Sequence, residues 1–177
     1  AHPDDEALGV GGTIIKHIEQ GDDVNIVIFS LGEESKLSNN INPKGRLKSA
    51  KEWSKRAGSN IYSILDYPDQ KLDIVPKLEI IQVLEKILKA LRPDILYTHH
   101  DGDINHDHQI VSHAILTALR PMNALALKSE IRTFETVSST EQAPYTERYT
   151  FKPNYYVDID DVWKKKVIAL EAYKNEL

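Results

Sequence analysis

The side chains best suited to chemistry stand at the start of the sequence, in the stretch AHPDDE at residues 1–6. Burying an imidazole next to several carboxylates is costly unless a cation or a proton offsets their charge. Pro3 biases His2 towards an extended backbone, and a tight turn would let His2 and Asp5 bind one metal ion. Asp4 adjoins a ligand, and a carboxylate near a metal-activated water can act as its general base. We therefore expect His2 and Asp5 to be metal ligands and Asp4 to be the base.

A second cluster of candidate ligands extends from His99 to His113 and contains five of the seven histidines. A catalytic zinc takes about three nitrogen or oxygen ligands and keeps one position for water, so this cluster should supply the third ligand. His108 and His113 would diverge on a helix, whereas His106 could share a side with His108 only in an extended stretch. We expect His108, at the start of a helix, to be the ligand. Zn²⁺ is the expected ion, although the same ligands suit other divalent metals.

Purely structural explanations compete with these assignments. Asp and Glu at the start of a helix complement its dipole, and this explanation is favoured for Asp4, Asp5 or Glu6 taken singly. The complete motif, together with a His-rich strand end, favours a metal site instead, in which Glu6 would orient a ligand or cap the helix. The three glycines at residues 9–12 match no phosphate-binding loop, and we interpret them as sites of close helix–sheet packing.

Alternating apolar patterns predict the elements that must position these side chains. Helical periodicity with glycine or proline stops predicts helices at residues 8–21, 45–57, 75–91, 109–119 and 160–174. Short runs rich in β-branched residues predict strands at residues 24–29, 61–65, 95–98, 131–137 and 155–159. The core stripe expected within the third of these helices consists of Leu78, Ile81, Leu84 and Leu88. The alternation implies βαβ units, and therefore a largely parallel sheet with helices on both faces.

Ligand sites in such a sheet form at the carboxyl ends of the strands. Polar segments follow three predicted strand ends, at residues 31–35, 67–73 and 99–108, and would converge with the opening motif on one crevice. The opening motif stands where a strand should already have ended, and the last residue lies in a predicted helix. We therefore expect a first strand and some C-terminal structure to be absent from this sequence.

Size and composition favour one ordinary globular domain spanning residues 1–177. The sequence has no cysteine, which excludes disulfides and thiolate metal sites and is compatible with the reducing cytoplasm, the compartment that we expect. No apolar run approaches the roughly 20 residues that span a membrane. The net charge of −5 and the lack of a basic run argue against nucleic acid or anionic lipid as a partner.

Taken in order, the motifs resemble those of the LmbE-like, or PIG-L-type, zinc-dependent N-deacetylases over nearly the whole chain. The most specific motif is AHPDDE followed by a Gly-Gly helix start. The others are LGEES, the arginine at position 46, PDQKLD, RPDILYTHHDGDINHDH, SSTE and PNYYVDI. The resemblance implies a Rossmann-like three-layer αβα fold. It also implies hydrolysis of the N-acetyl group of an amino sugar, usually an N-acetylglucosamine conjugate, to acetate and a free amine.

Carried over by position, the resemblance implies the same metal ligands and general base as the motifs do. It further implies that Arg46 and Asp69 contact the substrate and that Asp107 orients a catalytic histidine. Ser49 stands where many members of the family carry Glu, three residues after the arginine. We expect the loss of that carboxylate to leave Arg46 available to the substrate.

One departure from the family pattern concerns the general acid. A well-known form of the pattern reads HPDH, with its first histidine as general acid and oxyanion stabiliser. This chain reads NHDH at residues 105–108, so that Asn105 stands in the position of that histidine. An amide donates a hydrogen bond to an oxyanion but supplies no proton at neutral pH. His106, His100 and protonated Asp4 are the remaining candidates for the acid, and we prefer Asp4.

The expected partner is a small-molecule amino-sugar conjugate, and the sequence leaves open whether the protein forms a homo-oligomer. Two other functions compete with N-deacetylation. One is metal-dependent hydrolysis of another amide or an ester, including a phosphoester. The other is a catalytically silent sugar-binding module, which Asn105 suggests because it replaces an expected acid.

Overall fold

The computed structural model describes residues 1–32, 43–120 and 128–174. They belong to two compact units, which we describe separately. The first unit comprises Ala1–Gln70 and Lys152–Leu177, and the second comprises Lys71–Phe151. Most of the LGEES motif at residues 31–35 lies outside the described residues. The expectation of a single domain over the whole chain stays a prediction.

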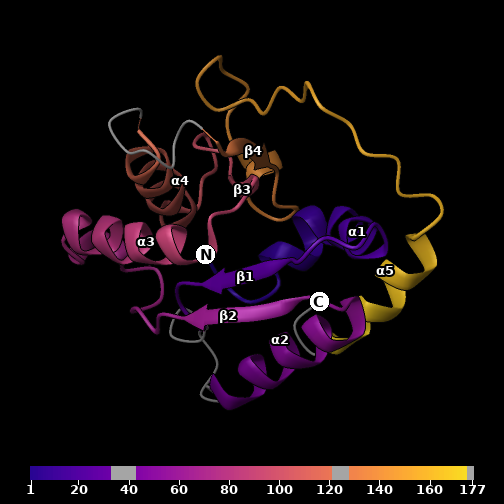
Figure 1. Cartoon of the computed structure of the whole chain (residues 1–177). Coiled ribbons are helices and arrows are strands. Elements are labelled where there is room, and N and C mark those ends of the chain that lie inside the picture. Colours follow the sequence, from indigo (N-terminus) through magenta and orange to yellow (C-terminus); the bar gives the residue numbers. More distant parts are fainter. Residues whose placement is uncertain (33–42, 121–127, 175–177) are drawn as a thin grey trace. The chain divides into compact units, whose positions relative to one another are not determined.

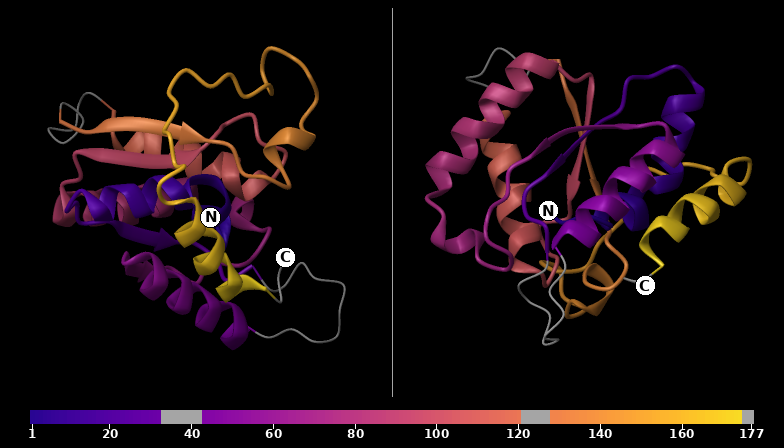
Figure 2. Two further views of the ribbon diagram at one scale, coloured as in Figure 1. Left: turned by 90° about the vertical axis from the view of Figure 1, so that its right-hand side faces the viewer. Right: turned by 90° about the horizontal axis from the view of Figure 1, so that it is seen from below.

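The first unit contains a pair of parallel strands, β1 (Asn25–Ile28) and β2 (Asn60–Ile64). Its helices are α1 (Asp5–Glu19), α2 (Pro43–Ala57) and α5 (Trp163–Leu170), the last followed by the short 3-10 helix η3 (Glu171–Tyr173) (Figure 1). Helix α2 packs against β2, and the three α-helices pack on one another. Figure 2 shows α5 lying alongside α2. Two segments that are far apart in the sequence therefore pack in the same core.

Large apolar side chains from β1 and from the helices fill the core of the first unit. Ile28 and Trp53 are only 2% and 1% exposed, and burial of such side chains contributes roughly 1.5–3 kcal/mol each. Gly12 on α1 allows a close approach, because a Cβ there would lie 2.7 Å from Cδ1 of Ile159. The close packing expected at the glycines is therefore present at Gly12, but its partner is the segment before α5 rather than the sheet.

The second unit contains another pair of parallel strands, β3 (Ile95–His99) and β4 (Glu130–Phe134). Its helices are α3 (Lys77–Leu91) and α4 (His106–Ala118), with the short 3-10 helices η1 (Leu72–Ile74) and η2 (Thr140–Gln142). Helix α3 packs on α4, and α4 contacts both β3 and η1. The amino end of α4 therefore lies in the same packed unit as the carboxyl end of β3.

The prediction of which α3 residues lie in the core is wrong at one position. Leu78 is 64% exposed, whereas Ile80, Leu84 and Leu88 are 0%, 2% and 3% exposed. Residues four apart lie on one face of a helix, so Ile80 continues the face of Leu84 and Leu88. Leu78 is two residues from Ile80 and therefore lies on the opposite side, towards solvent.

The strand predicted at residues 155–159 is also wrong, because the described segment 151–159 has no regular secondary structure. Strand propensity reflects packing on a paired, half-buried surface. Tyr155 and Tyr156 are instead 57% and 78% exposed. Exposed in this way, these tyrosines do not form a half-buried surface, and their high strand propensity produces no strand here.

The remaining elements confirm the α/β class. Both strand pairs in the described residues are parallel, and helices alternate with strands along the chain. Helix α4 begins at His106 rather than at residue 109, which matters for the histidines it carries. Among the helices that the structure describes, none combines the length and the apolar character required to cross a membrane.

Candidate active site

The AHPDDE motif forms the turn that starts α1 in the first unit. Asp4 precedes the helix with a backbone φ of 105°, a conformation that costs a non-glycine residue about 1–3 kcal/mol. Its carbonyl oxygen accepts hydrogen bonds from the backbone N–H groups of Ala7 and Leu8, each at 2.9 Å. The helix start therefore holds Asp4 in a strained position, as is common for residues at functional sites.

Arg46 fixes the side chain of Asp4. Its Nη2 donates to Asp4 Oδ2 at 2.6 Å and to the Pro3 carbonyl oxygen at 3.3 Å. Its Nη1 donates to the carbonyl oxygen of Gly32 at 2.5 Å, and the whole residue is buried. Although position 49 carries no carboxylate, Arg46 is engaged with the predicted general base. That pairing was not expected from the sequence.

The environment of Asp4 moves its pKa towards neutrality. Burial raises the pKa of this carboxyl group and the neighbouring Asp5 raises it further, while Arg46 lowers it, so that it comes to about 6. A general base works best when its pKa lies near the operating pH. The first unit therefore holds Asp4 in a state suited to taking up and returning a proton.

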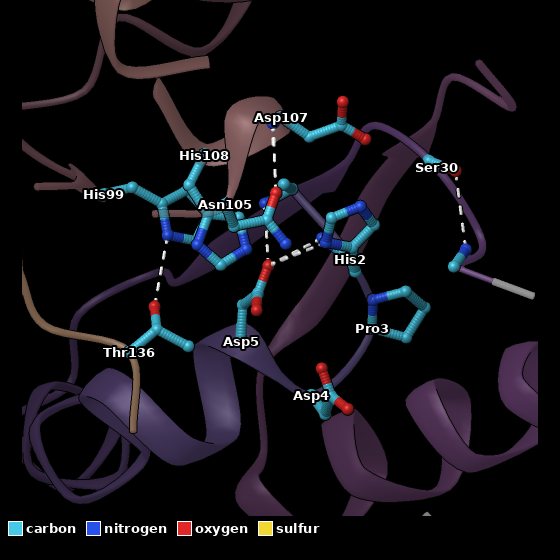
Figure 3. A network of polar contacts seen from close by, with 12 residues as sticks. His2, Pro3, Asp4, Asp5, Ser30, His99, Asn105, Asp107, His108 and Thr136 are labelled. Carbon is cyan, nitrogen blue, oxygen red and sulfur yellow. Dashed lines mark hydrogen bonds and ion pairs between the residues drawn. The ribbon is translucent and has the colours of Figure 1, made fainter. Parts of the chain in front are cut away.

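His2 and Asp5, the ligands predicted in this unit, lie together and are buried (Figure 3). The backbone N–H of His2 donates to Asp5 Oδ2 at 2.7 Å, and His2 Nδ1 lies 3.6 Å from the same oxygen. Asp69, which is also buried, places Oδ1 3.3 Å from His2 Nε2. A carboxylate at this distance can orient His2 or share its metal ion, so Asp69 has a role open to it besides the predicted substrate contact.

Glu6 and Tyr173 connect this turn to the last helical segment of the chain. The hydroxyl of Tyr173 donates to Glu6 Oε1 at 2.9 Å, and Tyr173 itself is fully buried. Glu6 Oε2 accepts the backbone N–H of Asp4 at 3.2 Å, and burial raises the pKa of Glu6 to about 7. Glu6 therefore holds the backbone just before α1, while its two expected roles, orienting a ligand and capping the helix, stay predictions.

The NHDH motif starts α4 in the second unit. Asn105 caps this helix, because its Oδ1 accepts the backbone N–H of Asp107 at 3.0 Å. The buried Asp107 accepts the backbone N–H of Leu72 through Oδ1 at 3.1 Å, and so joins η1 to α4. Since the helix already begins at His106, His106 and His108 are helical neighbours two apart and point in different directions.

His108 is almost completely buried and is held on two sides. Its Nδ1 lies 3.1 Å from Oδ2 of the fully buried Asp103. Its ring stacks on the ring of His99 with a centroid distance of 3.9 Å and an interplanar angle of 8° (Figure 3). His99 in turn contacts the hydroxyl of Thr136 through Nδ1 at 3.2 Å. The predicted ligand thus has a fixed ring orientation.

Asp103 and its partners are the part of the candidate site that we did not predict from the sequence. Asp103 Oδ2 accepts hydrogen bonds from the hydroxyls of Ser139 and Thr140, at 2.8 and 2.6 Å. Burial alone would raise the pKa of Asp103, but hydrogen bonds from His108 and Thr140 lower it to about 2. Asp101, two residues earlier, is exposed. The residue type alone therefore does not show which of the two aspartates is buried. The SSTE motif contains Ser139 and Thr140, and it is the feature of the sequence that could have pointed to these donors.

The donor set suits a divalent metal ion. Zinc takes imidazole nitrogen and carboxylate oxygen, and a chain without cysteine has no thiolate to offer. Each unit contains buried side chains of these types, so the residue types present suit such an ion. They are His2, Asp5 and Asp69 in the first unit and Asp107 and His108 in the second.

Comparison with known proteins identifies relatives that act on N-acetyl sugars. The family model described as PIG-L, GlcNAc-PI de-N-acetylase, matches residues 1–119, a range that includes every predicted site residue. Diacetylchitobiose deacetylase of Thermococcus kodakarensis is 28% identical over 189 residues, which cover 99% of this chain and 67% of that protein. A probable N-acetyl-alpha-D-glucosaminyl L-malate deacetylase 2 of Bacillus anthracis is 25% identical over 183 residues, covering 99% and 78%.

Solved structures show the same fold. The crystal structure of GalB, the 4-carboxy-2-hydroxymuconate hydratase of Pseudomonas putida, matches with a TM-score of 0.78 and 21% sequence identity. The match covers 97% of this chain and 75% of that one. The Rossmann-like α/β fold expected from the sequence is thereby confirmed. Because this neighbour is named as a hydratase, the fold alone does not identify the reaction.

Proposed function

Since the chain belongs to the PIG-L family of GlcNAc-PI de-N-acetylases, we propose that it hydrolyses the N-acetyl group of an N-acetylglucosamine-type sugar conjugate. The products are acetate and a free amine. The observation that carries this proposal is the half-buried Asp4, which Arg46 holds through a 2.6 Å hydrogen bond and whose pKa comes to about 6. The named activities of the two curated relatives agree with it.

The proposed cofactor is a divalent metal, with zinc as the first choice. His2, Asp5 and His108 are the proposed ligands, and their nitrogen and oxygen donors suit zinc. When bound, such an ion would polarise the acetyl carbonyl group and lower the pKa of the attacking water. Asp69 and Asp107 are further donors of the same kind, so they are the next residues to test as ligands.

Asp4 is the proposed general base and general acid. It removes a proton from water as the water oxygen bonds to the acetyl carbon, giving a tetrahedral oxyanion. Protonated Asp4 then returns that proton to the sugar nitrogen while the C–N bond breaks, which releases acetate and the amine. A carboxyl group with a pKa near 6 exchanges protons in both directions close to neutral pH. No separate acid is needed at position 105.

Asn105 is the proposed oxyanion donor. Its Oδ1 is occupied by the backbone N–H of Asp107, which fixes the plane of the amide group. In this proposal the Nδ2 hydrogens donate to an oxygen that gains charge in the transition state. In this scheme Asp107 positions the start of α4 through Leu72.

Arg46 and Asp69 remain the proposed substrate contacts, each with a second role. Arg46 is hydrogen-bonded to Asp4, so a substrate hydroxyl and the carboxylate of Asp4 would both have to accept from the same guanidinium group. Asp69 lies against His2, so it would both bind the substrate and orient His2, a proposed metal ligand. Carboxylate and guanidinium groups are suited to the hydroxyls of a sugar ring, because they accept or donate several hydrogen bonds at once.

A substrate panel tests the proposal directly. The purified protein is loaded with zinc and incubated with diacetylchitobiose, N-acetylglucosaminyl malate and other N-acetylglucosamine conjugates, and free acetate is measured. Acetate release that stops on chelation and returns with zinc is the expected result. Release of phosphate from a sugar phosphate, or hydration of an unsaturated acid, without acetate would favour another reaction. Sugar binding by calorimetry without any turnover would favour a binding module.

The proposed location is the cytoplasm, with which a chain lacking cysteine is compatible. Cell fractionation tests it. The proposed partners are small-molecule sugar conjugates, and the oligomeric state is measured by sedimentation of the same zinc-loaded preparation.

A further inference from the structure

Asp103 is a buried carboxylate surrounded by donors within the second unit. It is 0% exposed. Its Oδ2 accepts from Ser139 and Thr140 and faces Nδ1 of His108 at 3.1 Å. Its Oδ1 accepts the backbone N–H of Asn105 at 2.7 Å. A carboxylate buried with this many donors is stabilised as the anion, and an anion at this place controls the imidazole next to it.

The contact with Asp103 selects one tautomer of His108. A carboxylate anion only accepts hydrogen bonds, so His108 must donate from Nδ1 to make this contact. A neutral imidazole protonated at Nδ1 carries its lone pair on Nε2, the atom that can then bind a metal. Histidine ligands commonly donate their other ring N–H to a carboxylate in this way.

The plane of the His108 ring is fixed independently of its tautomer. His99 at the end of β3 stacks on it at 3.9 Å, and Thr136 holds His99 through Nδ1. Both histidines are 2% exposed. Rotation of the His108 ring would therefore break the stack and the Asp103 hydrogen bond together.

We propose that Asp103 is a positioning residue, which holds His108 as the Nδ1–H tautomer and thereby presents Nε2 to a divalent metal ion. This inference rests on the proposed assignment of His108 as a metal ligand. Ser139 and Thr140 belong to it as donors to Asp103, and they connect the segment around η2 to the ligand.

Two measurements on the full chain test the positioning role. The first is ¹⁵N NMR of the histidine rings in the metal-free protein, which reports the tautomer without any metal or activity. The second is the zinc Kd, measured by competition with a chromophoric chelator. The variants are Asp103→Asn, which keeps the shape and removes the charge, and Thr140→Val, which removes one donor to Asp103. Asp101→Asn is the matched control, because Asp101 lies in the same loop and is exposed.

In the wild type we expect His108 to be protonated at Nδ1. Asp103→Asn should reduce the population of that tautomer and weaken zinc binding by roughly 10–100-fold. Thr140→Val should have a smaller effect in the same direction, and Asp101→Asn should leave both readouts unchanged. Circular dichroism and thermal melting identify any variant that does not fold. If Asp103→Asn is one of these, Thr140→Val decides the question.

Failure of the positioning role and failure of the proposed function give different results. A wild-type His108 protonated at Nε2, or a zinc Kd within twofold of wild type in folded Asp103→Asn, would overturn the role of Asp103. A wild-type protein that binds no zinc would instead overturn the metal assignment itself, whichever tautomer the NMR shows.

Discussion

Arg46 Nη2 lies 2.6 Å from Oδ2 of Asp4, a residue whose backbone φ is 105°. The pairing sets two properties of Asp4 at once. It holds the carboxylate in one place, and it keeps the pKa lower than burial alone would make it. The chemistry proposed for Asp4 depends on both properties, so the variants that separate them are the most informative ones.

Removal of the charge at Asp4 should abolish most of the activity without loss of metal. Asn tolerates positive φ better than most residues, and its amide oxygen can still accept from Arg46, so Asp4→Asn should fold. A lost general base typically costs about 10²–10⁴-fold in rate. The measurements are kcat for acetate release and bound zinc per chain. Near-normal turnover in Asp4→Asn would mean that another residue handles the proton.

Removal of Arg46 should change the pH dependence of the reaction. Arg46 lowers the pKa of Asp4, so Arg46→Gln should let that pKa rise above about 6. The base works only when deprotonated, and the acidic limb of the kcat/KM profile should therefore move to higher pH. Arg56→Gln is the control, because Arg56 lies on the same helix and pairs with Glu52 near the surface. An unmoved acidic limb in Arg46→Gln would show that Asp4 does not set it.

His108 should be required for metal binding. His108→Ala removes the proposed nitrogen ligand and should lose stoichiometric zinc after dialysis, measured by elemental analysis. His113→Ala is the matched control, since His113 lies on the same helix and is exposed. Both variants should remain folded, because α4 also carries the buried Val111 and Ile115. Full zinc retention in His108→Ala would exclude His108 as a ligand.

The elements of the fold follow well from local patterns. Apolar runs such as the one at residues 24–29 and the periodicity of α3 mark buried faces, and burial of these faces determines where the elements form. The failures have physical reasons too. Leu78 was expected in the core because it is apolar, yet its position on α3 turns it to solvent. Residues 155–159 have strand-forming side chains, but a strand needs a partner that local sequence does not specify.

The candidate site was predictable only where a motif carries its own chemistry. His2 and Asp5 are close in sequence, and a turn was enough to bring them together. Asp103 depends on Ser139 and Thr140, which are more than thirty residues away, so its burial and its donors follow from tertiary packing. The same holds for the pairing of Arg46 with Asp4, which joins α2 to the start of α1.

Glu6 should make the stability of the metal-free protein fall as the pH rises. Burial raises its pKa from 4.5 to about 7 in the folded state, so the folded protein holds this proton more tightly than the unfolded chain does. Stability from this group is fully present below pH 4.5 and is lost as the pH rises through 7. A tenfold difference in proton affinity between the folded and unfolded states corresponds to about 1.4 kcal/mol, so even part of the effect is measurable.

Glu6→Gln isolates that contribution, because glutamine keeps the size of the side chain and its carbonyl oxygen can still accept the N–H of Asp4. The urea-unfolding free energy of chelated wild type should decrease between pH 5 and pH 8, and in Glu6→Gln the decrease should be smaller. Tyr173→Phe serves as a second probe. It removes the hydroxyl that donates to Glu6 and should cost about 0.5–1.5 kcal/mol. Tyr145→Phe, at a residue 93% exposed, should cost nothing measurable. Identical pH slopes in wild type and Glu6→Gln would show that Glu6 does not titrate between those two pH values, and the decrease would then belong to other groups.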